Sequence, residues 1–80
     1  LYERAIDDYN KALALAPDVF SVYAGFASIY SLMGNEVSAC EWLNKAVEKD
    51  KKSQIKYWTN NRYFDNIRNS NCYIKIMDSQ

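Results

Sequence analysis

Apolar side chains recur at steps of three and four residues over residues 2–15, the spacing that places them along one side of an amphipathic helix. The members of this stripe are Tyr2, Ala5, Ile6, Tyr9, Ala12 and Leu13. Charged residues such as Glu3 and Lys11 occupy the rest of the circumference. Because Pro17 cannot continue a helix, the pattern predicts that this helix ends just before it.

Two further helices are predicted over about 19–32 and 36–49. The first has a broad apolar face, suited to burial on two sides, made of Val19, Val22, Tyr23, Phe26, Ala27, Ile29 and Tyr30. The second has a packing side made of Val37, Ala39, Cys40, Leu43, Ala46 and Val47, with Trp42 beside it. We expect Asp18 to cap the first of these helices, Gly34 to end it, and Asn35 to cap the next. The short turn between them predicts an antiparallel helical hairpin.

The pattern changes after residue 50. A polar turn over residues 50–53 precedes two short predicted helices, about 62–67 with Asn61 as its cap and about 71–78 with Ser70 as its cap. The side chains expected to be buried there are Phe64, Ile67, Tyr73, Ile74, Ile76 and Met77. No segment has the alternation of a strand, so the expected fold class is all-α.

The chain also matches itself at a displacement of 34 residues. The matched positions are Ala5 with Ala39, Tyr9 with Leu43, Ala12 with Ala46, and the word Asn10–Leu13 with Asn44–Val47. Self-similarity at a fixed period of this length is the mark of stacked helical hairpins, and 34 residues is the tetratricopeptide period. Small residues at 27, 39 and 46 would let two helices approach closely, and bulkier neighbours would fill the remaining space.

The chain resembles the tetratricopeptide repeat family, whose signature reads W-x2-L-G-x2-Y, then A-x3-F, A and P. The matching residues of the central unit are Tyr23, Phe26, Ala27, Tyr30, Ala39, Leu43 and Ala46, while Lys51 replaces the proline. The resemblance implies a superhelical solenoid of antiparallel hairpins. Residues 1–17 are then expected to be the second helix of a truncated repeat, 18–53 one complete repeat, and 54–80 a degenerate repeat that caps the array.

The repeat register fails in this last part. A further shift of 34 residues places Asn60 and Asn61 where Phe26 and Ala27 stood. The tail resembles the end of many bacterial repeat arrays, which read Asp-Pro-x-Phe-Asp-x-Leu-Arg and then Asp-Pro-x-Phe. The residues that match it are Phe64, Asp65, Ile67, Arg68 and Tyr73. A terminal repeat that differs from the others is expected of a capping element, because it turns a solvated face outward.

In this family, the first helix of each hairpin lines a concave groove that holds the ligand. Carried over to this chain, the groove positions are Ser21, Ala24, Ser28 and Ser31, with Ile55 and Trp58 one period later as exposed apolar anchors. The resemblance implies a protein or peptide partner. The Lys and Asn residues with which some members grip a C-terminal carboxylate are absent at these positions, so chaperone C-terminal peptides are not expected to bind.

Nothing in the composition favours catalysis. The sequence has no histidine and only two glycines. It lacks a phosphate-binding loop, and its cysteines do not have the spacing of zinc ligands. No catalytic, cofactor-binding or metal-ligating residue is therefore predicted, and the chain is expected not to be an enzyme. The alternative function is that of a regulatory tail on a bacterial signalling or transcription-regulatory protein. The first residues lie in mid-helix pattern, as expected for a piece of a longer protein.

Cysteine usage and hydropathy bear on location. Cys40 and Cys72 lie far apart in the sequence and suggest no disulfide framework, so a reducing compartment and a cytoplasmic location are expected. Cys40 is interpreted as a small core residue. No apolar run approaches the roughly 20 residues of a membrane span, and no membrane partner is expected. Because the helix over residues 2–15 has no hairpin mate, part of its stripe should be uncovered, which predicts self-association.

Charge is balanced overall but uneven along the chain. Residues 1–50 carry eight acidic and four basic residues, whereas residues 51–80 carry six basic and two acidic residues. The basic residues of the second part alternate with aromatic ones, a combination that can bind single-stranded nucleic acid. The simpler interpretation is that Tyr57 and Tyr63 pack against the fold and that the lysines decorate a solvated turn. Nucleic acid is therefore not the favoured partner.

Overall fold

The computed structural model describes residues 2–80, and within that range every regular element is helical. The elements are α1 (Tyr2–Leu15), α2 (Phe20–Leu32), α3 (Glu36–Lys49), α4 (Ile55–Trp58), the 3-10 helix η1 (Arg62–Phe64) and α5 (Asn71–Asp78). The all-α class is confirmed. Four of the five predicted helices agree with the structure to within one residue. The predicted helix over 62–67 is instead a single 3-10 turn followed by further turns.

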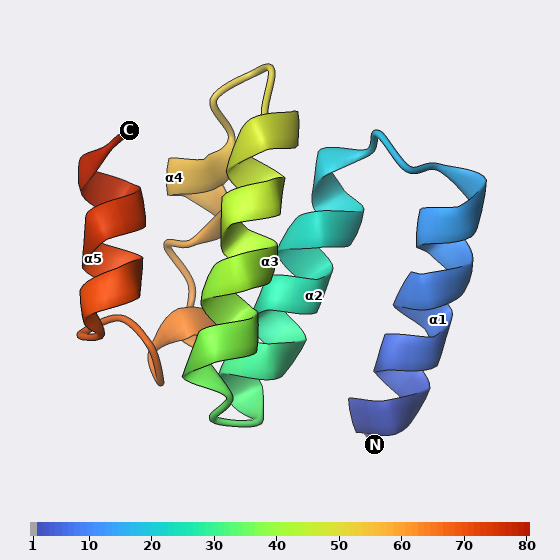
Figure 1. Ribbon diagram of the computed structural model, residues 1–80, viewed down its shortest axis with the longest axis horizontal. Coiled ribbons are helices and arrows are strands. Elements are labelled where there is room, and N and C mark those ends of the chain that lie inside the picture. Colours follow the sequence, from blue (N-terminus) through green and yellow to red (C-terminus); the bar gives the residue numbers. More distant parts are fainter. Residues whose placement is uncertain (1) are drawn as a thin grey trace.

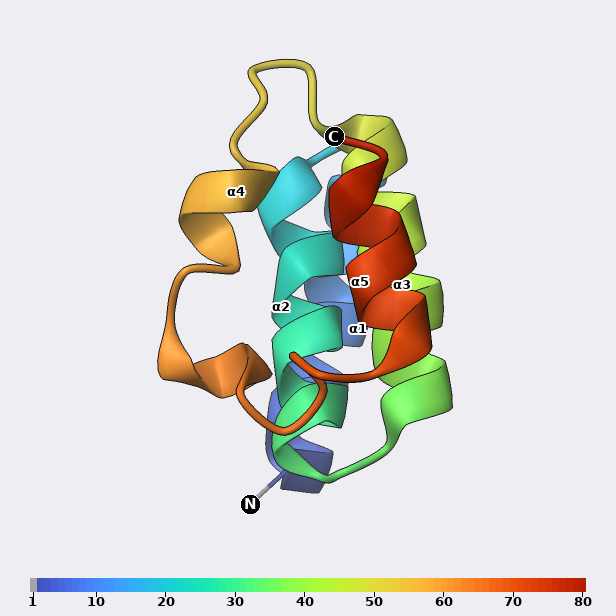
Figure 2. The same ribbon diagram turned by 90° about the vertical axis from the view of Figure 1, so that its left-hand side faces the viewer.

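The first three helices stand side by side, each antiparallel to the next, and α5 lies on the far side of α3 from α2 (Figure 1). Seen from the side of α5, the short elements α4 and η1 lie alongside α2, and α5 runs along α3 (Figure 2). The chain after residue 50 therefore wraps the α2–α3 hairpin. No helix within residues 2–80 has both the length and the apolar character to cross a membrane.

Small residues allow α2 and α3 to pack closely. Ala24 and Ala27 of α2, and Ala39 and Ala46 of α3, are completely buried in one core cluster. Beside this cluster, the Phe26 ring stacks on the Trp42 ring with centroids 4.0 Å apart. The predicted combination of small residues at the contact and large ones around it is therefore present.

Gly25 has a specific role in seating α1. A Cβ atom at this position would overlap the ring of Tyr9, which lies directly against α2. The Tyr9 ring also packs on Phe26, at a centroid distance of 5.5 Å. A side chain at residue 25 would therefore push α1 away.

Most of the predicted caps are confirmed. The Asn35 side chain accepts a hydrogen bond from the Ser38 amide at 3.1 Å, and Gly34 adopts the left-handed conformation at φ 77°. The side-chain oxygens of Asn61 and Ser70 cap η1 and α5.

The cap predicted for Asp18 is wrong, because α2 begins one residue later than expected. Val19 occupies the extended N-cap position and makes no side-chain cap. The Asp18 carboxylate instead pairs with Lys49 Nζ at 3.1 Å, which ties the start of α2 to the end of α3. The hydrogen bond and negative charge of Asp18 raise the pKa of Lys49.

The prediction that Cys40 and Cys72 stay unpaired is also wrong. Their Sγ atoms form a disulfide that joins α3 to α5 across 32 residues of sequence, with the Cα atoms 6.2 Å apart. Cys40 is buried, as expected. The pair forms because the chain after residue 50 folds back and brings the first turn of α5 alongside α3. Disulfides persist mainly in oxidising compartments, so the argument from free thiols for a reducing compartment no longer holds.

Three apolar residues lie outside the core although we expected them inside. Val19 before α2, Val37 in the first turn of α3 and Ile74 in α5 are all exposed. The short α5 turns only one side toward α3, and that side carries Tyr73 and Ile76. The expected burial of Phe64 and Ile67 is confirmed, and Met77 packs at the edge of the core.

The apolar stripe of α1 is covered on one side only. The helix packs against α2, yet none of its residues is buried, and Tyr2 is 41% exposed. By contrast, most of the residues of α2 are buried. Part of the stripe is therefore uncovered, in line with the sequence-based expectation.

Candidate functional site

The predicted groove face of α2 is largely covered by the chain itself. Ser21 is exposed, but Ala24, Ser28 and Ser31 are buried. The backbone oxygen of Ser31 accepts a hydrogen bond from Asn66 Nδ2 at 2.9 Å. An open concave face is therefore not present at these three positions, since all three are buried and η1 and the segment after it pack against α2.

The serine hydroxyls on this face are directed inward. Ser28 Oγ donates to the backbone oxygens of Gly25 and Ala24, at 2.9 and 3.1 Å. Ser31 Oγ is buried and has no hydrogen-bond partner within residues 2–80. Neither hydroxyl is available to a ligand in this arrangement.

The two side chains predicted to be exposed apolar anchors differ in how deeply they are buried. Ile55 is buried in the core, so its expected exposure is wrong. Trp58 is half-buried, and the Phe20 ring meets it edge to face at a centroid distance of 6.0 Å. The geometry of α4 explains the difference, because its inward side carries Ile55 and, four residues later, the buried C-cap residue Thr59.

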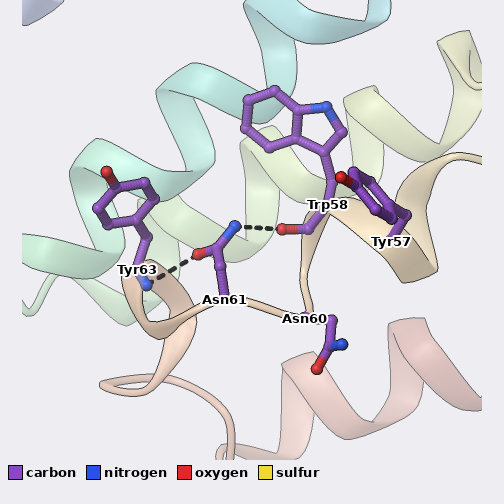
Figure 3. Close-up of a pocket in the computed structure, with 5 residues that line it drawn as sticks. All are labelled: Tyr57, Trp58, Asn60, Asn61 and Tyr63. Carbon is purple, nitrogen blue, oxygen red and sulfur yellow. Dashed lines mark hydrogen bonds between the residues drawn. The ribbon is translucent and has the colours of Figure 1, made fainter.

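The same geometry turns Tyr57 outward. Its side chain is 86% exposed and Tyr63 is 50% exposed, so the expectation that both tyrosines pack is wrong. Together with Trp58, Asn60 and Asn61 they line a hollow of about 340 Å³, which we term the aromatic hollow (Figure 3). Its lining combines three aromatic side chains with the amides of two asparagines.

Asn61 holds the aromatic hollow in shape. Its Oδ1 accepts the backbone N–H of Tyr63 at 2.8 Å, and its Nδ2 donates to the backbone oxygen of Trp58 (Figure 3). The indole of Trp58 and the ring of Tyr63 stand on either side of this amide in the close-up. The sequence predicted only the capping role of Asn61. Its bonds to the backbone of both Trp58 and Tyr63 were not predicted. The feature of the sequence that could have indicated them is the pair of asparagines flanked by aromatic residues.

Arg68 fixes the irregular segment that carries the hollow. Its Nη2 lies 3.1 Å from Oδ1 of Asp65 and forms an ion pair with it. The guanidinium also donates to the backbone oxygens of Thr59 and Asn61 and to the hydroxyl of Tyr73. These contacts, which the sequence did not predict, join α4, η1 and α5 through one side chain.

The surroundings of the aromatic hollow are basic. Its neighbours in sequence include Lys51, Lys52, Lys56 and Arg62, and Arg62 also lines an adjoining hollow with Arg68. No group of three or more His, Cys, Asp or Glu side chains within residues 2–80 is placed to hold a metal ion.

Comparison with known proteins identifies no relative. No protein-family model matches the chain, and neither a curated protein nor a solved structure has significant similarity to it.

Proposed function

We propose that the chain is a protein-interaction segment of a tetratricopeptide-like array, without catalysis of its own, and that residues 54–80 close the array. The antiparallel order of α1, α2 and α3 supports this proposal, as do the alanines at their contacts. So does the wrapping of the C-terminal part over α2 and α3, since a capping repeat covers what would otherwise be an open face.

The observation that carries the proposal is the unequal coverage of the two sides of the molecule. The α2–α3 hairpin is closed by α4, η1 and α5, and α5 is cross-linked to α3. On the other side, α1 presents a half-covered apolar stripe. We therefore assign the stripe of α1 as the surface against which a further helix packs, either from the same array or from a partner protein.

The same surface accounts for the expected self-association of the isolated chain. With no other helix available, two copies would pair through α1 and bury their stripes, most simply in a symmetric dimer. Light scattering on residues 1–80 measures this directly, and a monomeric mass at high concentration would count against pairing.

A test of the proposal compares neighbouring positions on α1. Lysine replaces Tyr2 or Ile6 of the stripe in two variants, and Glu3 or Asp7 of the polar side in two matched controls. Both controls lie at exposed positions of the same helix. Each variant is used, in the full-length protein, to capture partners from its native source, and thermal melting confirms that it is folded.

The proposal predicts that a protein partner is recovered with the wild type and both controls, and is lost with Tyr2→Lys and Ile6→Lys. Recovery of the same partner with all four variants would place the interaction elsewhere and contradict the proposal. Capture of no protein by the wild type would contradict it as well.

A further inference from the structure

The exposed aromatic residues of the aromatic hollow have no packing role that explains them. Tyr57 is 86% exposed and Tyr63 is 50% exposed, although each belongs to a short helical element that packs inward through another residue. Those inward residues are Ile55 for α4 and Phe64 for η1. Two largely solvated rings beside a half-buried indole therefore form a surface suited to a planar ligand.

The Trp58 indole and the backbone that carries the hollow are restrained before any ligand arrives. The Phe20 edge limits the movement of the Trp58 indole on its buried side. Asn61 bonds the backbone at both Trp58 and Tyr63, and Arg68 bonds the backbone of Asn61 and Thr59. Restraint of this kind lowers the ordering cost of binding.

The chain segment that forms the hollow is positively charged and holds no acidic residue of its own. Lys51, Lys52, Lys56 and Arg62 lie within residues 51–63, a stretch without a single acidic residue. The two flanking carboxylates are already engaged. Asp50 accepts the amides of Gln54 and Ile55, and Asp65 pairs with Arg68. The two ion pairs found over residues 2–80, Lys49–Asp18 and Arg68–Asp65, include none of the four bases.

From this juxtaposition we infer that the aromatic hollow binds single-stranded nucleic acid. Bases stack on Tyr57, Trp58 and Tyr63, and the four basic side chains contact the phosphates between them, the two interactions by which single strands are held without sequence preference. The Asn60 side chain lies at the edge of the hollow and offers its amide to a base edge. This binding is separate from the proposed role of α1.

An acidic peptide would complement the positive charge of this surface but not its open shape. Peptide anchors fill enclosed, desolvated pockets, whereas Tyr57 offers the open face of a ring to solvent. Duplex nucleic acid would satisfy the charge as well, but its bases are already stacked and unavailable to the tyrosines. The choice among these three occupants is therefore measurable.

The test measures the anisotropy of fluorescent oligothymidine and oligouridine of about ten nucleotides, titrated with the full chain at several salt concentrations. A duplex of the same length and polyglutamate serve as probes of charge alone. The variants are Tyr57→Ala and Tyr63→Ala for stacking, and Lys56→Gln and Arg62→Gln for phosphate contact. Their matched controls are Ile74→Ala and Lys75→Gln, both in α5. All six positions are exposed, so each variant is expected to stay folded.

The inference predicts that at least one single strand binds more tightly than the duplex and polyglutamate. Each tyrosine variant of the hollow should weaken binding roughly tenfold, and each charge variant should reduce the salt slope by about 0.7. The two controls should bind as the wild type does. A higher affinity for oligouridine identifies RNA as the ligand, and a higher affinity for oligothymidine identifies DNA.

Any one of four results would overturn the inference. Equal binding of the duplex, or tyrosine variants that bind as tightly as the wild type, would reduce the interaction to non-specific charge attraction. Tighter binding of polyglutamate would assign the surface to an acidic peptide. Absence of measurable binding to either single strand at low salt would remove the site altogether.

Discussion

Asn66 Nδ2 donates a hydrogen bond to the backbone oxygen of Ser31 at 2.9 Å, linking the segment after η1 to the last turn of α2. Ser31 belongs to the face that a tetratricopeptide groove would offer to its ligand. In this chain, part of that face is occupied by the chain's own C-terminal region. A partner of the folded molecule therefore cannot reach this part of α2 as it would reach a tetratricopeptide groove, whereas α1 and the aromatic hollow both carry exposed side chains.

The disulfide between Cys40 and Cys72 should contribute substantially to stability. Closing a loop of 32 residues restricts the unfolded chain, and this effect is worth about 4 kcal/mol in the chain-entropy description. The variant with serine at both positions should therefore unfold at lower urea concentration than the oxidised wild type. Adding reductant should bring the wild type close to the variant and leave the variant unchanged. Identical urea midpoints for all four samples would show that the two thiols are not joined.

Gly25→Ala should displace α1 from α2, because the added methyl group overlaps the Tyr9 ring. We expect a loss of about 1–3 kcal/mol in the free energy of unfolding, the usual cost of overpacking. Adding Tyr9→Ala should recover part of the loss caused by Gly25→Ala, and a double-mutant cycle measures the coupling. A coupling energy of zero would mean that Tyr9 does not contact residue 25.

Ser31→Ala should stabilise the protein. The Ser31 hydroxyl is buried without a hydrogen-bond partner within residues 2–80, so its removal relieves a desolvation cost of about 1 kcal/mol or more. Ser28→Ala is the matched control, since the Ser28 hydroxyl donates to two backbone oxygens and its removal brings no such relief. Chemical denaturation of both variants tests the difference. Equal losses of stability would indicate that the Ser31 hydroxyl is bonded.

Arg68→Lys should destabilise the fold, although it keeps the positive charge. The planar guanidinium reaches Asp65, Tyr73 and two backbone oxygens at once, which an ammonium group cannot do. We expect a loss of about 2–3 kcal/mol in the free energy of unfolding, with the change concentrated in the amide exchange of residues 59–68. Asp65→Asn removes only the exposed ion pair and should cost less than about 1 kcal/mol. Equal losses in the two variants would show that the backbone contacts of Arg68 are unimportant.

The helices were predictable because their signals are local. Apolar spacing placed α1, α2, α3 and α5, and Pro17, Gly34, Asn35 and Ser70 marked where helices end or begin. The cap predicted for Asp18 was wrong because a local pattern does not show distant partners. The Asp18 carboxylate pairs with Lys49, which lies far away in the sequence.

The arrangement of the C-terminal part was not predictable in the same way. The path of residues 50–70 depends on hydrogen bonds between side chains and backbone atoms beyond the next turn. The Asp50 carboxylate accepts the amides of Gln54 and Ile55, and the Arg68 guanidinium donates to the backbone oxygens of Thr59 and Asn61. That path decides three things at once: that Cys72 meets Cys40, that Tyr57 points outward, and that Ser31 is covered. The residues of the candidate site were visible in the sequence, but their exposure was not.

The central claim is that partner proteins bind at α1 while the C-terminal region closes the opposite side. The most direct measurement places a photoreactive phenylalanine analogue at position 2 in one full-length protein and at position 63 in another. Both positions are naturally exposed tyrosines, one on α1 and one in the aromatic hollow. The account predicts that irradiation joins a protein partner to position 2 and not to position 63. A protein partner joined to position 63 and absent from position 2 would contradict it.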